Sequence, residues 1–372
     1  MDLSVGVGIG SGPPLGRLKG ALRAARVAGF DSAWVVDHFL GFFPDAIWDK
    51  RFTWLAGDGG SPHAYFDHQT LLGALASKAG NLQLAVGVTE PVRRHPVLIA
   101  QAAMTLSHLT TRPPILGIGA GERENTEPFG LSFERPVARL EEALRIIRTC
   151  FSSAGPFEFH GEFWDMPDAV MDLAPAPGRT PELWVAAHGP RMLGLTGAHG
   201  DGWYPTHPMH PAEYAESLAV ITAAATRAGR DPNAITPGAQ VSIVVAKTEA
   251  RARAMLSHPS LRFLALLLPD SVWQAEGRRH PLGDGHRGMV DLVPHRLDAD
   301  EVWEAIEAVE PDLLAERIVW GDRRRVVGAI RDLADAGLRH VVLQPASGLV
   351  SRSDALYALR SLRAIRSDLV GG

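Results

Sequence analysis

Short apolar segments alternate with amphipathic segments along nearly the whole chain, and this alternation restricts the fold more than any other feature. Runs of strand length are expected at residues 3–9, 32–36, 82–86, 115–118, 183–187, 202–204, 236–246 and 340–343. Helical periodicity is expected at residues 15–28, 67–79, 96–109, 136–151, 191–198, 211–228, 249–268, 325–336 and 353–365. Because strands that alternate with helices form parallel sheets, about eight such units predict an α/β fold, a closed (β/α)8 TIM barrel.

Two long, turn-rich stretches interrupt this repeat, at residues 41–64 and 269–316. Both follow the ends of expected strands. In a barrel of this kind, insertions after strands lie over the C-terminal mouth, where active sites are found. We therefore expect residues 1–372 to form one barrel domain with two insertions over its mouth.

Composition excludes several classes of protein. The net charge of −5, from 37 basic and 42 acidic residues, argues against a nucleic-acid or anionic-membrane surface. The longest apolar run, residues 264–268, is too short to span a bilayer. Cys150 is the single cysteine and cannot form an internal disulfide, and residues 1–4 show no secretion signal. The sequence predicts a cytoplasmic enzyme that acts on a small molecule.

The first candidate site is the pair Asp37-His38, which comes directly after the apolar run 32–36. At that position both side chains would lie at the mouth of the barrel. A histidine exchanges a proton near neutral pH, and Asp37 can fix its tautomer or bind a polar ring. The alternative is that the pair only caps a loop, and position alone does not decide between the two.

A glycine-rich run follows another expected strand. Residues 116–121 read Leu-Gly-Ile-Gly-Ala-Gly, and Glu122 comes next. The segment Gly119, Ala120 and Gly121 would let a ligand approach backbone N–H groups. A similar run at residues 6–10 lacks the full dinucleotide spacing and is interpreted as a tight turn.

Two further loops follow strands. In Ala187-His188-Gly189-Pro190 a strand ends and a helix begins, so its free N–H groups suit a phosphate. His188 is alternatively a satisfied histidine at a strand end. Thr89 lies in the polar loop after the strand that contains Val86 and Gly87, and this loop is alternatively a preamble to the helix from residue 96.

Signals for other chemistries are weak. Residues 207–210 read His-Pro-Met-His, but proline disturbs the spacing and neither cysteine nor carboxylate joins it, so no metal site is expected. The motifs G-x-S-x-G and H-E-x-x-H and the Walker sequence do not occur. These patterns give no support to the corresponding hydrolases and nucleotide triphosphatases.

Taken together, these segments resemble the bacterial-luciferase-like superfamily. Within it the chain is similar to the coenzyme F420-dependent branch, and especially to the phthiodiolone ketoreductase group of actinobacteria. The likeness is carried by Asp37-His38 and by residues 88–106, 115–127, 136–144, 184–193, 280–283 and 338–343. It extends over nearly the whole chain, including both insertions.

The resemblance implies roles for individual residues. Asp37 and Thr89 would contact the deazaflavin, and a non-proline cis peptide would fall near Val86-Gly87. His38 is implied as a proton-transfer residue and Glu122 as a second acid/base candidate. Residues 187–190 would receive the phosphate-bearing tail of F420, together with the glycine loop at 119–121.

One departure from the related sugar-phosphate dehydrogenases bears on the substrate. Their pocket-lining tryptophan, a few residues after Asp-His, is replaced here by Gly41-Phe42-Phe43. We therefore expect a mainly apolar ketone or alcohol, such as a lipid or secondary metabolite, rather than a sugar phosphate.

The resulting hypothesis is an F420-dependent oxidoreductase, expected as a homodimer. F420 would supply the hydride, His38 as imidazolium would protonate the developing alkoxide, and Glu122 would tune His38 or relay the proton. An FMN-dependent monooxygenase and a non-catalytic F420-binding protein remain as alternatives.

Overall fold

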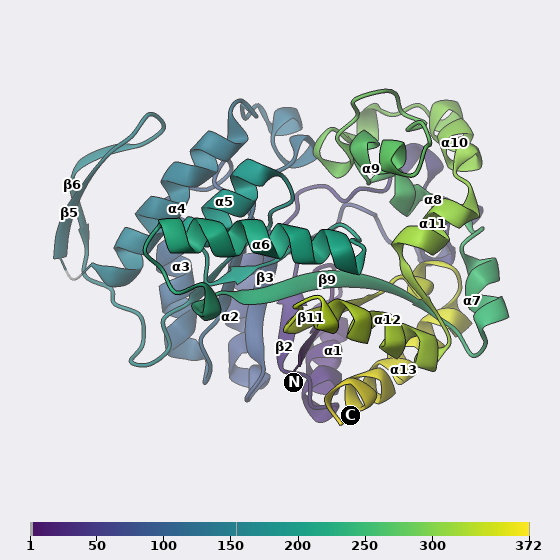
Figure 1. The fold of residues 1–372 in the computed structure, drawn as a ribbon, viewed down its shortest axis with the longest axis horizontal. Coiled ribbons are helices and arrows are strands. Elements are labelled where there is room, and N and C mark those ends of the chain that lie inside the picture. Colours follow the sequence, from purple (N-terminus) through teal and green to yellow (C-terminus); the bar gives the residue numbers. More distant parts are fainter. Residues whose placement is uncertain (1–2, 154, 372) are drawn as a thin grey trace.

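Eight parallel strands close into a barrel in the computed structural model, which describes residues 3–153 and 155–371 (Figure 1). The barrel strands are β1 (Ser4–Gly8), β2 (Ser32–Val35), β3 (Gln83–Thr89), β4 (Ile115–Ile118), β7 (Glu182–Val185), β8 (Gly202–Trp203), β9 (Thr236–Val245) and β11 (His340–Pro345). β1 pairs with both β2 and β11, and β8 pairs with β9, so the sheet has no free edge in the barrel. The predicted (β/α)8 fold is confirmed.

Helices surround the barrel and bury one face each against it. They are α1 (Leu15–Val27), α2 (His68–Ala79), α3 (Pro96–Leu109), α4 (Pro136–Ser152), α5 (Pro190–His199), α6 (Pro211–Arg227), α12 (Arg323–Asp335) and α13 (Arg352–Val370). In α1, for example, Leu18, Leu22 and Ala25 are buried, as the helical spacing predicted. Within the barrel, the ring of Trp34 stacks on that of Tyr204 with centroids 4.4 Å apart. None of the described helices combines the length and apolar character that crossing a membrane requires.

The prediction of a single helix over residues 249–268 is wrong, because this segment forms two helices. α7 (Glu249–Met255) ends before His258, and α8 (Pro259–Leu266) begins at the proline. Proline has no N–H and fits the first position of a helix rather than its interior. The Nδ1 atom of His258 accepts a hydrogen bond from the backbone N–H of Ser260 and caps the new helix.

The insertion over residues 269–316 is helical rather than only turn-rich. It contains α9 (Asp270–Ala275), α10 (Ala299–Ala308) and α11 (Pro311–Arg317), and β10 (Val319–Gly321) then pairs with the end of β9. Ile47 and Phe52 of the first insertion share a buried apolar cluster with Phe263 of α8 and Trp273 of α9. The two insertions therefore pack together, and α8 to α11 lie on one side of the barrel in Figure 1.

An antiparallel hairpin that the sequence did not predict projects from the barrel. It consists of β5 (Gly155–His160) and β6 (Asp165–Met171), and it extends away from the other elements in Figure 1. Phe157 and Phe159 alternate there with exposed Glu158 and His160, which is the period-2 pattern of a strand.

A local irregularity in β3 explains why residue 117 in the glycine-rich run is a glycine. A non-proline cis peptide joins Gly87 to Val88, and the register between β3 and β4 shifts between Val86 and Thr89. A Cβ atom at Gly117 would lie 2.2 Å from the carbonyl oxygen of Val86. Glycine at that position therefore allows β4 to pass close to the irregular segment.

Candidate active site

The predicted site residues follow the C-terminal ends of four barrel strands. Asp37 and His38 follow β2, Thr89 ends β3, Glu122 follows β4, and His188 follows β7. The carboxyl ends of parallel strands lie at one end of a barrel, so these residues share its mouth.

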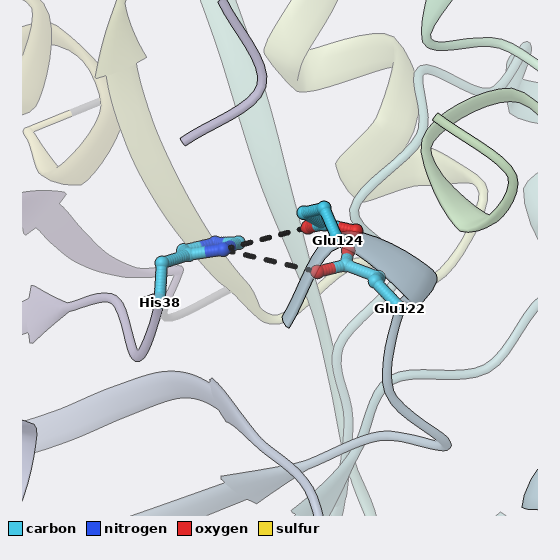
Figure 2. Close-up of side chains that lie close together, drawn as sticks. All are labelled: His38, Glu122 and Glu124. Carbon is cyan, nitrogen blue, oxygen red and sulfur yellow. Dashed lines mark ion pairs between the residues drawn. The ribbon is translucent and has the colours of Figure 1, made fainter. Parts of the chain in front are cut away.

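His38 lies opposite two carboxyl groups, as Figure 2 shows. Its Nδ1 atom is 3.9 Å from Oε2 of Glu122 and 3.7 Å from Oε1 of Glu124. The short 3-10 helix over Arg123–Asn125 turns the chain so that both glutamates approach the ring.

Asn125 fixes the protonation pattern of the His38 ring. The side-chain oxygen of Asn125 accepts hydrogen bonds from the backbone N–H groups of Phe39 (2.6 Å) and Leu40 (3.2 Å). Its Nδ2 atom is therefore the donor toward Nδ1 of His38, at 2.8 Å. Nδ1 must offer a lone pair to that donor, which makes the neutral Nε2–H tautomer the favoured form.

The environment of His38 also lowers its pKa. Burial of the ring is the largest cause, and the charge of Arg93 acts in the same direction, whereas Glu122 opposes both. The ring is therefore mainly neutral at neutral pH. This geometry does not favour the resting imidazolium that the sequence-based hypothesis requires.

Glu124 is fully buried next to this ring. Burial raises its pKa well above the ordinary value, and the charge of Glu122 raises the pKa further. The Oε1 atom of Glu124 accepts a hydrogen bond of 3.0 Å from Nδ2 of Asn125. Burial and the neighbouring Glu122 thus favour the protonated form of the Glu124 carboxyl group.

The spacing of His38, Glu122 and Glu124 resembles a metal site, since their ligand atoms lie within 4.8 Å of one another. However, Nδ2 of Asn125 already lies 2.8 Å from His38, 3.0 Å from Glu124 and 3.4 Å from Glu122. An amide donor thus occupies the point on which the three groups converge. The arrangement is that of a hydrogen-bonded cluster, and it gives no support to a metal centre.

Asp37 is the centre of a buried charge network. Its Oδ2 atom accepts hydrogen bonds from Oγ1 of Thr89 (2.7 Å), Nη1 of Arg94 (2.7 Å) and Nη2 of Arg93 (3.0 Å). Nδ1 of His68 lies 3.2 Å from Oδ1. These five residues, here called the Asp37 network, bring together β2, β3 and the start of α2.

The Asp37 network holds the segment that carries His38. Burial alone would raise the pKa of Asp37, but the nearby His68 and the charges of Arg93 and Arg94 lower it well below its ordinary value. Arg93 also donates to the backbone oxygen of Asp37 at 3.0 Å. Thr89 is fully buried and Asp37 nearly so. This geometry supports a role for Asp37 and Thr89 in anchoring His38.

The remaining predicted residues lie at the same mouth but make different contacts. Gly121 has a φ of +91°, which favours glycine, and Gly119 and Ala120 precede it. Nε2 of His188 accepts a hydrogen bond of 3.2 Å from the backbone N–H of Thr206. The His188 ring stacks on His207 at 4.1 Å, and burial, with a smaller effect of His207, lowers its pKa well below the ordinary value. His188 thus has the contacts of a satisfied histidine.

The start of α5 is the most open part of the predicted cofactor region. Gly189 is exposed, and no atom lies within 4 Å of the position that a Cβ would take there. Gly189 precedes Pro190 at the first position of the ten-residue helix and provides no side-chain cap. The first N–H groups of α5 therefore suit an anion. Ala187 is buried, and its backbone oxygen accepts a hydrogen bond from the Trp203 indole at 2.9 Å.

Comparison with known proteins identifies the family. The sequence profile described as luciferase-like monooxygenase matches residues 3–340. The chain belongs to the luciferase-like monooxygenase family. It is 37% identical over 334 residues to the phthiodiolone/phenolphthiodiolone dimycocerosates ketoreductase of Mycobacterium tuberculosis (strain H37Rv), an alignment that covers 89% of this chain and 88% of that protein.

Solved structures of other proteins share the fold. One is an F420-dependent secondary alcohol dehydrogenase in complex with an F420-acetone adduct, with a TM-score of 0.77, 19% identity and 99% of each chain covered. Another is the FMN-bound oxygenating constituent of 3,6-diketocamphane monooxygenase from Pseudomonas putida. It has a TM-score of 0.65 and 18% identity, and 100% of this chain and 98% of that chain are covered. The same barrel fold is thus found with either cofactor.

Sequence reasoning missed several residues of this luciferase-like site. Glu124 and Asn125 lie two and three positions after the predicted Glu122, and a second carboxyl and an amide in that run were the available signal. The contacts of Arg93, Arg94 and His68 with Asp37 span from 31 to 57 positions along the chain, so no local pattern predicts them.

Proposed function

We propose that this chain is an F420-dependent oxidoreductase that transfers a hydride between F420 and the carbonyl carbon of a mainly apolar ketone or secondary alcohol. The observation that carries the proposal is the 37% identity, over 89% of the chain, to proteins named as ketoreductases. The placement of His38 and Glu122 at the barrel mouth supports it, because carbonyl reduction requires a group that exchanges a proton beside the reacting oxygen.

The residues at the mouth fit the proposed cofactor. The open N-terminus of α5 at Gly189 and Pro190 would hold the phosphodiester tail, because its N–H groups are free of a side-chain cap. Val86 and Gly87 of β3, with the glycine loop ending at Gly121, would support the ring system, as the family resemblance implies. When bound, F420 supplies or accepts the hydride.

The chain's own residues would position the carbonyl group and move one proton. The Asp37 network fixes the backbone at His38, and Asn125 orients the His38 ring. Glu122 lies 3.9 Å from that ring, and its side chain is 22% exposed, so it can reach a ligand. His38 and Glu122 are therefore the proposed pair beside the reacting oxygen.

Aromatic side chains next to His38 support an apolar substrate. Phe42 packs edge-on against the His38 ring with centroids 5.0 Å apart, and Tyr65 lies 5.6 Å away. Phe39 and Phe129 form a second pair at 4.7 Å and remain 43% and 47% exposed. An exposed aromatic pair next to a catalytic loop suits the chain of a long apolar ketone.

The choice of cofactor is tested by titration of the purified protein. We expect F420 to bind more tightly than FMN, and reduced F420 to be oxidised when an apolar ketone is added. Tight FMN binding without F420 binding would support the monooxygenase alternative. F420 binding with no turnover of a panel of ketones and secondary alcohols would support the non-catalytic alternative.

The apolar rim is tested by replacing Phe39 and Phe129 together with serine. We expect KM for a long-chain ketone to rise roughly tenfold, about 1.4 kcal/mol, because part of the apolar contact is lost. KM for acetone should change little. The control is the double change Leu356→Ser and Leu359→Ser on α13, where both side chains are similarly exposed. An equal increase in KM for both ketones would contradict the proposed contact.

A further inference from the structure

Glu122 and Glu124, here called the acid pair, differ in their access to solvent. The side chain of Glu122 is 22% exposed, whereas that of Glu124 is 0% exposed. They are two residues apart on the loop after β4, and their oxygens lie within 4.8 Å of each other. One carboxyl group of the pair can therefore touch a substrate, and the other cannot.

The contacts of Glu124 are those of a neutral acid. Its Oε1 atom has Asn125 as a donor, but among the described residues its Oε2 atom has no hydrogen-bond partner. A buried carboxylate with an unsatisfied oxygen is costly, because burial removes the water that would stabilise the charge. A proton on Glu124 removes that charge and gives the carboxyl group an O–H that can be donated toward Glu122, whose oxygen lies within 4.8 Å.

The other charged and polar groups around Glu124 do not compensate a negative charge on its carboxyl group. Arg93 lowers the pKa of Glu124 slightly, but its guanidinium is bonded to Asp37 and Glu90. Tyr65 has its own pKa raised to about 12 by burial and by Glu124, so it stays neutral. His38 is neutral and already accepts from Asn125.

We propose that Glu124 is a proton reserve that supplies the substrate oxygen through Glu122. This inference rests on the proposed function. As hydride from reduced F420 forms the new C–H bond, the O–H bond of Glu124 breaks, and its proton passes to Glu122. The proton then moves from Glu122 to the substrate oxygen and forms the alcohol O–H. Water returns one proton to the acid pair afterwards, and alcohol oxidation runs through the same positions in reverse.

The resting proton is measured on the protein without added cofactor. With glutamate carboxyl carbons labelled with carbon-13, infrared spectra at neutral pH should show one protonated carboxylic acid. That band should disappear in Glu124→Gln and remain in Glu134→Gln, a change at an exposed glutamate on the loop before α4. Because the wild-type spectrum needs no variant, absence of the band there would overturn the inference even if a variant failed to fold.

The delivery step is measured by the pH dependence of ketone reduction. In the wild type, kcat should fall as the pH rises through the pKa of the acid pair, because the proton is present below that pKa and absent above it. Glu124→Gln should lower kcat roughly 10²-fold and remove this dependence, with F420 affinity unchanged. If Glu124→Gln lost the infrared band but kept the wild-type kcat and pH profile, the proton on Glu124 would take no part in the reaction. That result would overturn the proposed proton reserve.

Failure of the proposed function gives a different pattern. If the wild type oxidised no reduced F420 with any ketone, the oxidoreductase proposal and the delivery step would both be wrong, although the infrared band would still be seen. If F420-linked turnover were normal and the band were missing, only the acid-pair inference would be wrong. The two failures are therefore distinguishable.

Discussion

Replacing His38 by alanine is expected to lower F420-linked turnover by roughly 10²–10³-fold, the usual contribution of one hydrogen-bond donor to an oxygen on which negative charge develops. The ring packs against Phe42 and lies within 4 Å of both carboxyl groups of the acid pair, and its tautomer is fixed by Asn125. F420 affinity should change little, because the start of α5 and the irregular segment of β3 remain intact. The measurement is kcat at saturating F420, with F420 affinity determined for the same variant.

The control for His38 is His160→Ala, which removes an exposed histidine on the projecting hairpin and should leave kcat near the wild-type value. Near-native turnover of His38→Ala would contradict the catalytic role. Comparison with Glu122→Gln then separates the contribution of His38 to kcat from that of the acid pair. If the proton comes from the acid pair, Glu122→Gln removes the pH dependence of ketone reduction, whereas His38→Ala lowers kcat and retains that dependence.

The barrel could be predicted because its periodicity is local. Each strand is a short apolar run, and each surrounding helix repeats its buried positions every three or four residues, as in Leu18, Leu22 and Ala25. The break at Pro259 was also in the sequence, since a proline inside an expected helix indicates a boundary. The hairpin over residues 155–171 was harder to predict, because its mostly exposed strands have little continuous apolar character.

The site could be located from the sequence, but its chemistry could not. Asp37, His38 and Glu122 were found because polar residues directly after barrel strands lie at the mouth. Their protonation depends on burial and on distant partners, which one sequence does not reveal. Asn125, 87 positions from His38, is what makes the neutral ring the favoured form. The same limit applies to Asp37, whose partners come from α2 and from the loop after β3.

Asp37→Asn is expected to destabilise the protein by roughly 3–5 kcal/mol at neutral pH, the usual cost of removing one partner from a buried ion pair. The change keeps the shape of the side chain but removes the negative charge that Arg93 and Arg94 face. Both the Asp37 and the Arg93 side chains are 2% exposed, so water cannot replace the lost partner. The measurement is the free energy of unfolding from urea titrations. The control is Asp284→Asn, which removes an exposed ion pair with Arg279 and should change the free energy of unfolding little.

The difference in stability between wild type and Asp37→Asn should depend on pH with a defined sign. Because the pKa of Asp37 is lower in the folded protein, its charge stabilises the fold above the unfolded value of about 3.9, and this contribution is lost as the pH falls toward the folded value. The difference should therefore be constant from pH 7 to about pH 5 and shrink below about pH 4. If Asp37→Asn instead kept wild-type stability and lost F420 affinity, Asp37 would be a cofactor contact, as the family resemblance implied, rather than the anchor of His38.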